Sequence, residues 1–108
     1  GIAKDYKQAI SWYRKSANQG NSRCQNNLGL MYEWGYGVTK DYHDAFGWYL
    51  KSANQGNEYG QYNLGLLYEY GNGVSQNFKL ALSWYQKASD QGHSSSKEKV
   101  KAIQSKIK

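Results

Sequence analysis

Proline is absent from this 108-residue chain, cysteine occurs once, and no long apolar run interrupts its polar composition. The single Cys24 forms no internal disulfide and falls short of the cysteine spacings of zinc and haem sites. No stretch reaches the roughly 20 apolar residues of a membrane-spanning helix, and no signal peptide is recognisable. We therefore expect no membrane span, no metal site and no cofactor. The first residue is not Met, so the compartment stays open.

Aromatic residues are plentiful for so polar a chain. It contains 11 Tyr, 4 Trp and 2 Phe at a mean hydropathy of -0.93. Tyr and Trp bury large areas while keeping a polar tip near water. This composition suits a thin structure in which no residue lies far from solvent.

The formal net charge of +6 is concentrated near one end of the chain. The last twelve residues hold five lysines and one glutamate, namely Lys97, Glu98, Lys99, Lys101, Lys106 and Lys108. Such a tail is typical of a solvated helix face, with contact to nucleic acid or anionic lipid as the alternative. Single-strand binders interleave basic and aromatic residues, whereas here the two are separate. We therefore do not expect nucleic acid as a partner.

The chain repeats itself with a period of 36 residues. Residues 21–56 and 57–92 are identical at 17 of 36 positions, and residues 1–20 match 37–56 at 13 of 20. Self-similarity of this length is the signature of stacked supersecondary units. We expect one solenoid domain: the second half of a repeat over 1–20, full repeats over 21–56 and 57–92, and a C-terminal capping helix over 93–108.

Capping residues predict two helices in each unit. Asn21 and Asn57 can accept a hydrogen bond from a free first-turn amide, and Gly35 and Gly71 can end the helix in the left-handed conformation. This first helix, helix A, is expected over 22–34 and 58–70. The second, helix B, is expected over 6–18, 42–54 and 78–90, with caps at Asp5, Asp41 and Asn77 and ends at Gly20, Gly56 and Gly92.

Helical spacing identifies the buried faces. In helix A the apolar or small residues recur at Cys24, Leu28, Met31, Tyr32 and Gly35, and again at Gly60, Leu64, Leu67, Tyr68 and Gly71. In helix B the same spacing joins Tyr42, Ala45, Trp48, Tyr49 and Ala53. Gly29, Gly65, Ala45 and Ala81 are small enough for close helix contact. The predicted fold class is all-α, a superhelix of stacked antiparallel helix pairs, because one pair cannot bury its faces alone.

The last segment fits a terminal helix. In register, Val100, Ala102 and Ile103 fall on apolar positions of helix A, so residues 96–107 are expected in a helix A position. Lys and Ser replace the glycines and tyrosines there, which gives the polar outer face that a cap needs. The start of the chain has no such cap. We expect that the chain is the C-terminal part of a longer solenoid, or that a second molecule, such as the partner in a homodimer, covers the first helix.

The repeated motif Leu-Gly-x-x-Tyr-x-x-Gly-x-Gly-Val, followed by Asp or Asn, Ala, Trp-Tyr-x-Lys and Gln-Gly, resembles the Sel-1-like repeat family. Residues 24–56 and 60–92 carry it, and residues 1–20 carry its second half. Tetratricopeptide repeats differ by a 34-residue period and a Pro. The resemblance implies a right-handed superhelix with helix A on the concave surface and helix B on the convex one. It also implies an adaptor that assembles complexes, as in endoplasmic-reticulum protein degradation, bacterial signalling and bacterial action on host cells.

A candidate partner-binding stripe remains on helix A once the packing set is removed. Its side chains fall three to four residues apart, at Arg23, Asn27, Leu30, Glu33, Trp34, Tyr59, Asn63, Leu66, Glu69 and Tyr70. Trp, Tyr and Arg are enriched at interface hot spots, and an Asn amide both donates to and accepts from a peptide backbone. We expect a protein or peptide partner there. The alternative for Leu30, Trp34 and Tyr70 is packing against the next repeat, which leaves Asn27 and Asn63 as better candidates.

Enzymatic activity is the rival interpretation. Some Cys-rich members of the family it resembles have been described as weak β-lactamases, and Ser94-x-x-Lys97 and Ser105-x-x-Lys108 fit the Ser-x-x-Lys motif of serine β-lactamases. The companion Ser-Asp-Asn and Lys-Thr-Gly elements are missing from the sequence. Those relatives also carry a Cys pair in each repeat. We therefore expect a binding module and no enzyme.

The remaining reactive residues fit structural roles. His43 and His93 have no carboxylate or thiol near them in the sequence except Asp44, and Asp44 points to another side of its helix. Cys24 takes the position of Gly60, which is typical of a buried small residue. The Gly-x-Gly turns at 35–37 and 71–73 end a helix, whereas a phosphate loop opens one.

Overall fold

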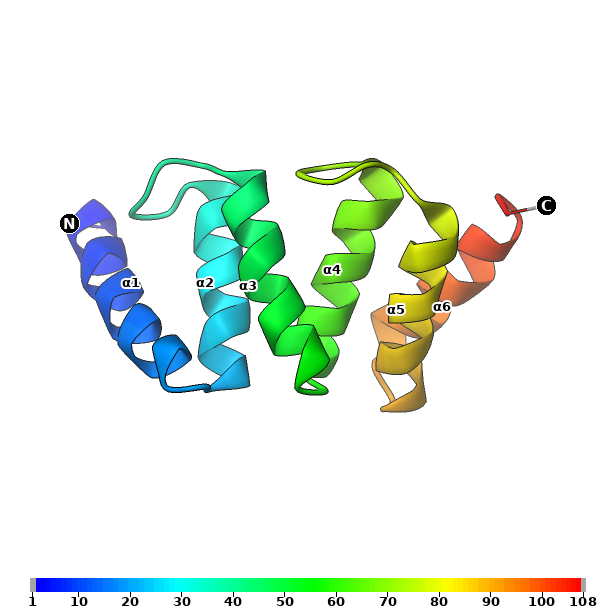
Figure 1. Ribbon diagram of the computed structural model, residues 1–108, viewed down its shortest axis with the longest axis horizontal. Coiled ribbons are helices and arrows are strands. Elements are labelled where there is room, and N and C mark those ends of the chain that lie inside the picture. The colour runs from blue at the N-terminus through cyan, green and yellow to red at the C-terminus, as the bar shows by residue number, and fades with distance from the viewer. Residues whose placement is uncertain (1, 108) are drawn as a thin grey trace.

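The computed structural model describes residues 2–107, with side chains described from residue 5. These residues form six helices and contain no strand: α1 (Ile2–Asn18), α2 (Ser22–Trp34), α3 (Tyr42–Asn54), α4 (Glu58–Tyr70), α5 (Phe78–Asp90) and α6 (Ser94–Gln104). The helices stand side by side in a row 46 Å long and 23 × 21 Å across (Figure 1). The all-α prediction is confirmed, and α2 to α5 have the bounds expected.

The caps of α2 and α4, the A-type helices of the two full repeats, explain why the bounds of these two helices are sharp. Asn21 Oδ1 accepts a hydrogen bond from Cys24 N at 2.9 Å, and Asn57 Oδ1 accepts one from Gly60 N at 2.9 Å. At the other end Gly35 has a φ of 72° and Gly71 one of 69°, which a residue without Cβ adopts most easily. The α2 and α4 boundaries are therefore set by local chemistry.

The expectation that Asp5 caps the first helix is wrong. The helix α1 begins at Ile2, so Asp5 lies within its first turn. In the later repeats the cap residue is held in an extended conformation by the preceding helix, because Asp41 N donates to Tyr32 O at 2.8 Å and Asn77 N to Tyr68 O at 2.9 Å.

The terminal helix α6 starts and ends earlier than the 96–107 expected. It begins 36 residues after α4, and its N-cap is His93, whose Nδ1 accepts a hydrogen bond from Ser96 N at 3.2 Å. His93 therefore takes the role that Asn21 and Asn57 have in the other A-type helices. Ile103 is only 1% exposed, which confirms its placement on an apolar helix A position.

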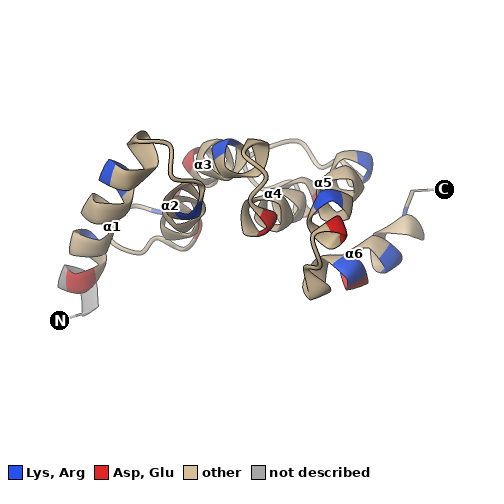
Figure 2. Ribbon diagram, turned by 90° about the horizontal axis from the view of Figure 1, so that it is seen from below, with Lys and Arg blue, Asp and Glu red and all other residues tan. Residues whose placement is uncertain are grey.

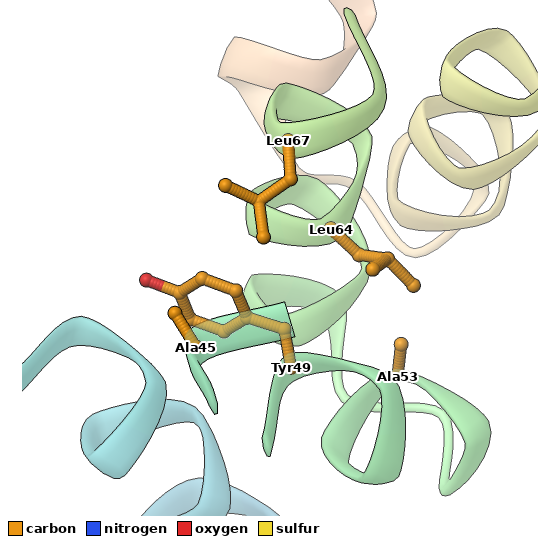
Figure 3. Packing of buried hydrophobic residues seen from close by; sticks show 5 residues of the cluster. All are labelled: Ala45, Tyr49, Ala53, Leu64 and Leu67. Atoms are coloured by element: carbon orange, nitrogen blue, oxygen red, sulfur yellow. The ribbon is translucent and has the colours of Figure 1, made fainter. Parts of the chain in front are cut away.

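The core is a string of small clusters between neighbouring helices. In the central cluster Ala45, Tyr49 and Ala53 of α3 meet Leu64 and Leu67 of α4 (Figure 3). Two further clusters flank it, formed by Ile10, Ala17 and Leu28 and by Ala81, Tyr85 and Ile103. Each cluster joins at least two helices, so each helix pair depends on its neighbours for burial.

In α3 and α5, a tyrosine of the B-type helix lies against a glycine of the A-type helix before it. A Cβ placed on Gly29 would overlap the Tyr49 ring, and one on Gly65 would lie 2.6 Å from Tyr85 Cε1. Both rings are fully buried. The two glycines of the Leu-Gly-Leu motif are therefore required by close approach of a ring, as the small-residue pattern predicted.

Neighbouring units join along a seam that recurs in the same register. Gln25 Nε2 donates to Ala17 O at 3.1 Å, and 36 residues later Gln61 Nε2 donates to Ala53 O at 3.4 Å. At the opposite end of the helices, Gly37 lies against the backbone of Tyr6 and Gly73 against that of Tyr42, where an added Cβ would fall 2.8 and 2.6 Å from the carbonyl oxygen. The seam thus rests on backbone contacts and on one buried amide per unit.

The row is bent, and its two helix types take opposite sides. Turned by 90°, α3 lies on the outer side of the bend, α2 and α4 lie on the inner side, and α1 and α6 lean toward that inner side (Figure 2). The helices α2 and α4 also contact each other directly. The A-type helices therefore form the inner face, where the candidate stripe was expected.

Candidate functional site

The inner face contains a shallow depression between α2 and α4. Its volume is about 540 Å³, and it is lined by Arg23, Asn26, Asn27, Asn57 and Tyr59. The first turns of the two helices supply these side chains, because Asn21 and Asn57 start both helices at equivalent positions of the repeat. The depression therefore lies between the N-terminal parts of two neighbouring A-type helices.

Side-chain amides connect the two helices beside this depression. Asn63 Nδ2 donates to Asn26 Oδ1 at 2.8 Å, and Asn57 Nδ2 lies 3.5 Å from Ser22 Oγ. Asn57 also caps α4 through its Oδ1. These bonds fix three of the amides in place, since each has a partner on the neighbouring helix or on its own first turn.

Three of the ten predicted stripe residues line the depression. Arg23 and Tyr59 are exposed there, and Asn27 is half-buried. Asn63 is also half-buried, but its amide is engaged with Asn26. Of the two amides singled out from the sequence, Asn27 is thus the one that lines the depression.

Four other stripe residues divide into packed and exposed pairs. Leu30, one of the three residues for which packing was the alternative, packs against the central cluster, and Leu66 packs against the cluster of Ala81, Tyr85 and Ile103. Trp34 is 58% exposed and Tyr70 is 56% exposed, at the C-terminal ends of α2 and α4. The Tyr70 hydroxyl accepts a hydrogen bond from Lys99 Nζ at 3.2 Å. The aromatic pair therefore remains accessible, away from the depression.

The two glutamates of the stripe hold the helix pairs together. Tyr49 OH donates to Glu33 Oε1 at 2.6 Å, and Tyr85 OH donates to Glu69 Oε1 at 2.7 Å. Burial, followed by the carboxylate beside each hydroxyl, raises the pKa of Tyr49, and burial and the Glu69 hydrogen bond raise that of Tyr85. Both tyrosines therefore stay neutral donors, and both glutamates act in the fold.

The expectation that Glu69 lies on an open face is wrong. It is only 4% exposed, because α6 covers it. Lys99 Nζ of α6 lies 3.4 Å from Oε1, and Lys106 Nζ, just after α6, lies 3.5 Å from Oε2. Burial alone would raise the pKa of this carboxyl, but the Tyr85 hydrogen bond and the two lysines outweigh it and hold the pKa below its ordinary value. Glu69 is thus a buried anion shared by α4, α5 and α6.

Sequence comparison at a fixed offset misses Asn26. Its partner Asn63 lies 37 residues away, one more than the period, so aligned repeats never place the two side by side. Asn57 was assigned only as a cap, although it also lines the depression. The sequence contained a signal for Asn26 and Asn57, because amide side chains are concentrated at the start of helix A, as in Asn21, Asn26 and Asn27.

The described part of the chain holds no group of three or more His, Cys, Asp or Glu side chains placed to share a metal ion. Ser94 and Lys97 are both exposed on α6, Ser105 Oγ donates to Ala102 O, and Lys108 lies outside the described residues. His43 is exposed, and Cys24 is half-buried against the Ile10 cluster. Over residues 2–107, no helix is both long and apolar enough to cross a bilayer.

This geometry defines an α-helical repeat protein with a polar, aromatic-flanked inner face. The Sel1 repeat family model matches residues 1–21, 22–57 and 58–93. The chain therefore belongs to the Sel1 repeat family. Proteins of this family generally mediate protein–protein interactions and are typically scaffolds without enzymatic activity.

Solved structures of the same family are similar to this chain. The crystal structure of a Sel1 repeat protein from Oxalobacter formigenes is 43% identical with a TM-score of 0.86 over 91% of this chain. The protective antigen c5321 of uropathogenic Escherichia coli, which has an SLR fold, is 41% identical with a TM-score of 0.83 over 84%. Helicobacter pylori cysteine rich protein B is 28% identical with a TM-score of 0.77 over 81%.

The present chain is shorter than these proteins. The matched part spans 40%, 20% and 65% of the Oxalobacter, Escherichia and Helicobacter chains, respectively. No curated protein matches the chain. The comparisons thus establish the family and the fold.

Proposed function

We propose that this chain is a binding module that takes an extended peptide segment of a partner protein along its inner face. The observation that carries the proposal is the depression of about 540 Å³ between α2 and α4, with Arg23, Asn27 and Tyr59 on its lining. A depression of this size and polarity suits a few residues of extended chain with specific polar contacts.

Asn27 supplies the central contact of the proposed complex. Asn26 and Asn63 are bonded to each other, so the Asn27 amide is the one that can pair with a peptide N–H and C=O at once. Arg23 adds a positive charge at the rim, which favours a carboxylate on the peptide. The partner segment is therefore expected to be extended and acidic at the Arg23 end.

Exposed aromatic rings extend the surface beyond the depression. Tyr59 is 54% exposed, and Trp34 and Tyr70 mark the other end of the same two helices. Aromatic side chains bury large areas at little cost in conformational entropy and are frequent hot spots. They favour a segment with an apolar residue placed a few positions from its acidic group.

Selection from a peptide library displayed on phage, followed by fluorescence anisotropy with the best binder, tests the proposal. Asn27→Ala should weaken binding by roughly 5-fold and Trp34→Ala by roughly 30-fold, from the loss of a hydrogen bond and of a hot-spot ring. Asn54→Ala is the matched control, since Asn54 is exposed at the end of α3 and away from the depression. Equal affinity for all three variants would contradict the inner-face site.

A further inference from the structure

The turn between α4 and α5 contains the one Asn-Gly pair of the sequence, Asn72-Gly73 (Figure 1). The turn between α2 and α3 has Tyr36-Gly37 at the equivalent positions. The two turns share one backbone conformation, because their glycines have φ angles of 72° and 77° in the first and of 69° and 74° in the second. The chain thus builds the same turn twice, with a chemically different residue before the last glycine.

An asparagine that precedes a glycine can react with its own main chain. The glycine nitrogen attacks the side-chain carbon Cγ, and the new N–Cγ bond closes a succinimide ring. The Cγ–Nδ2 bond breaks, and the amide group leaves as ammonia with the proton of the glycine N–H. Water then opens the ring at either carbonyl and leaves aspartate or isoaspartate. Glycine favours the attack because it has no side chain beside the nitrogen, and asparagine is accordingly a thermolabile residue.

The structure leaves both reacting groups of this pair free. Within residues 2–107, Gly73 N donates no hydrogen bond, and the side chain of Asn72 has no hydrogen-bond partner. The main-chain N of Asn72 donates to Leu67 O at 3.0 Å, so the chain is anchored just before the reacting atoms. Gly73 is exposed, which gives water access to the ring once it has formed.

Helices hold the other asparagines of the described chain. These residues lie within a helix or cap one, and none of them precedes a glycine: Asn18, Asn21, Asn26, Asn27, Asn54, Asn57, Asn63 and Asn77. The three caps use Oδ1 to accept a first-turn amide. After a helical asparagine, the next main-chain N–H is itself a donor, as Gln55 N is to Ser52 O at 3.2 Å. Sequence and backbone therefore both distinguish Asn72.

The residues that follow Asn72 are packed against the preceding unit. Gly73 lies against the main chain of Tyr42, where an added Cβ would fall 2.6 Å from the carbonyl oxygen, and Val74 packs against the central cluster. Isoaspartate would insert an extra carbon into the main chain directly before these two contacts. Either product also places a negative charge at the C-terminal end of α4, where the helix dipole disfavours it. Both changes act on the seam.

We propose that Asn72 is a site of spontaneous deamidation, and that its conversion to aspartate or isoaspartate loosens the seam between the two full repeats. The reaction consumes water and requires no enzyme. The converted fraction grows with the age of the molecule. The site lies apart from the inner-face depression, so its test is independent of peptide binding there.

Mass-spectrometric peptide mapping of the folded full chain, incubated in mildly alkaline buffer, tests the chemistry. Isoaspartate is identified by labelling with an isoaspartyl methyltransferase. Conversion is expected at Asn72 before any other asparagine. Asn72→Gln should abolish it, because the longer side chain would have to close a larger ring. Tyr36→Asn places the same pair in the matching turn, so a second site of conversion is expected there.

Urea unfolding of fresh and aged samples tests the effect on the seam. The added charge alone should raise the unfolding equilibrium constant about 2- to 5-fold in converted wild type. Asn72→Gln, aged in parallel, should keep its midpoint. This variant retains an amide in the turn, so it serves as the matched control.

Four outcomes would overturn the proposal. Conversion in urea but not in the folded chain would mean that the turn holds the pair in an unreactive arrangement. Conversion led by another asparagine, such as the cap Asn21, would remove the special place of Asn72. Lack of conversion in Tyr36→Asn would show that the shared turn does not favour the reaction. Equal midpoints of converted wild type and aged Asn72→Gln would refute the loosening of the seam.

Discussion

Two glycines in helix interiors should respond in opposite directions to the same substitution. Replacing an interior helical glycine with alanine stabilises by roughly 0.5–1 kcal/mol when space allows, because the unfolded chain loses less entropy on folding. At Gly47 in α3 an added Cβ meets nothing within 4 Å. Gly47→Ala is therefore expected to raise the free energy of unfolding by that amount.

At Gly65 in α4 the steric term reverses the sign. The new Cβ would lie 2.6 Å from Cε1 and 2.7 Å from Cδ1 of Tyr85. This ring is fully buried, so it cannot move aside into solvent. Overpacking of this kind costs about 1–3 kcal/mol, against a gain of about 1 kcal/mol in helix propensity. The net expectation for Gly65→Ala is a destabilisation of up to about 2 kcal/mol.

Urea unfolding followed by far-ultraviolet circular dichroism measures both variants against wild type. The denaturant slope should stay the same in all three, so that midpoints compare stabilities directly. Stabilisation of both variants would refute the role of the ring, and destabilisation of both would show that helix propensity was wrongly weighted. On a Tyr85→Leu background the additional cost of Gly65→Ala should be smaller than in wild type, because the ring edge is gone.

Three other perturbations test the packing of the last unit. Tyr85→Phe should cost about 1–2 kcal/mol by urea unfolding, and Tyr49→Phe less, because Glu69 is buried whereas Glu33 is partly open to water. Glu69 has a lowered pKa, so its charge stabilises the fold fully above about pH 4.3, and this contribution is lost as the pH falls through the lowered value. Stability should therefore fall less steeply with acid in Glu69→Gln. His93→Ala should cost about 1 kcal/mol by loss of the α6 cap, while His93→Asn should keep it.

Each of these has a result that would count against the structure. Equal losses in Tyr85→Phe and Tyr49→Phe would mean that α6 does not seal Glu69. If the free energies of unfolding of wild type and Glu69→Gln fell in parallel with decreasing pH, the charge of Glu69 would not stabilise the fold. A loss in His93→Asn as large as in His93→Ala would show that the ring contacts with Tyr59 and Tyr62 matter more than the cap.

Helix boundaries were predictable because the signals that set them are local. An asparagine before the first turn and a glycine after the last act within four residues, so α2 and α4 could be placed to the residue. Asp5 shows the limit of that reasoning, since it lies within the first turn of α1, whereas Asp41, whose N–H donates to Tyr32 O, caps α3. A cap that depends on another helix cannot be identified from its own neighbours.

The candidate site was predicted less well, because it depends on how units meet. The stripe on α4 follows the helical period, yet Glu69 is removed from the surface by α6, which lies in the next unit. The Asn26 to Asn63 bond crosses between units with an offset of 37, which the period of 36 hides. Whether a side chain of one helix is exposed thus depends on the helix that packs against it, and the spacing within the first helix does not reveal that neighbour.

The recurring seam has a consequence for how proteins of this kind can change in length. Its contacts use a buried Gln, a carbonyl oxygen and a turn glycine at positions that recur with the repeat. The end of each unit is therefore complementary to the start of any other unit of this type. Duplication of residues 22–57 would insert a unit whose two borders already match their new neighbours. Extra units would then lengthen the inner face by whole steps, while α6 would keep its contacts with α5.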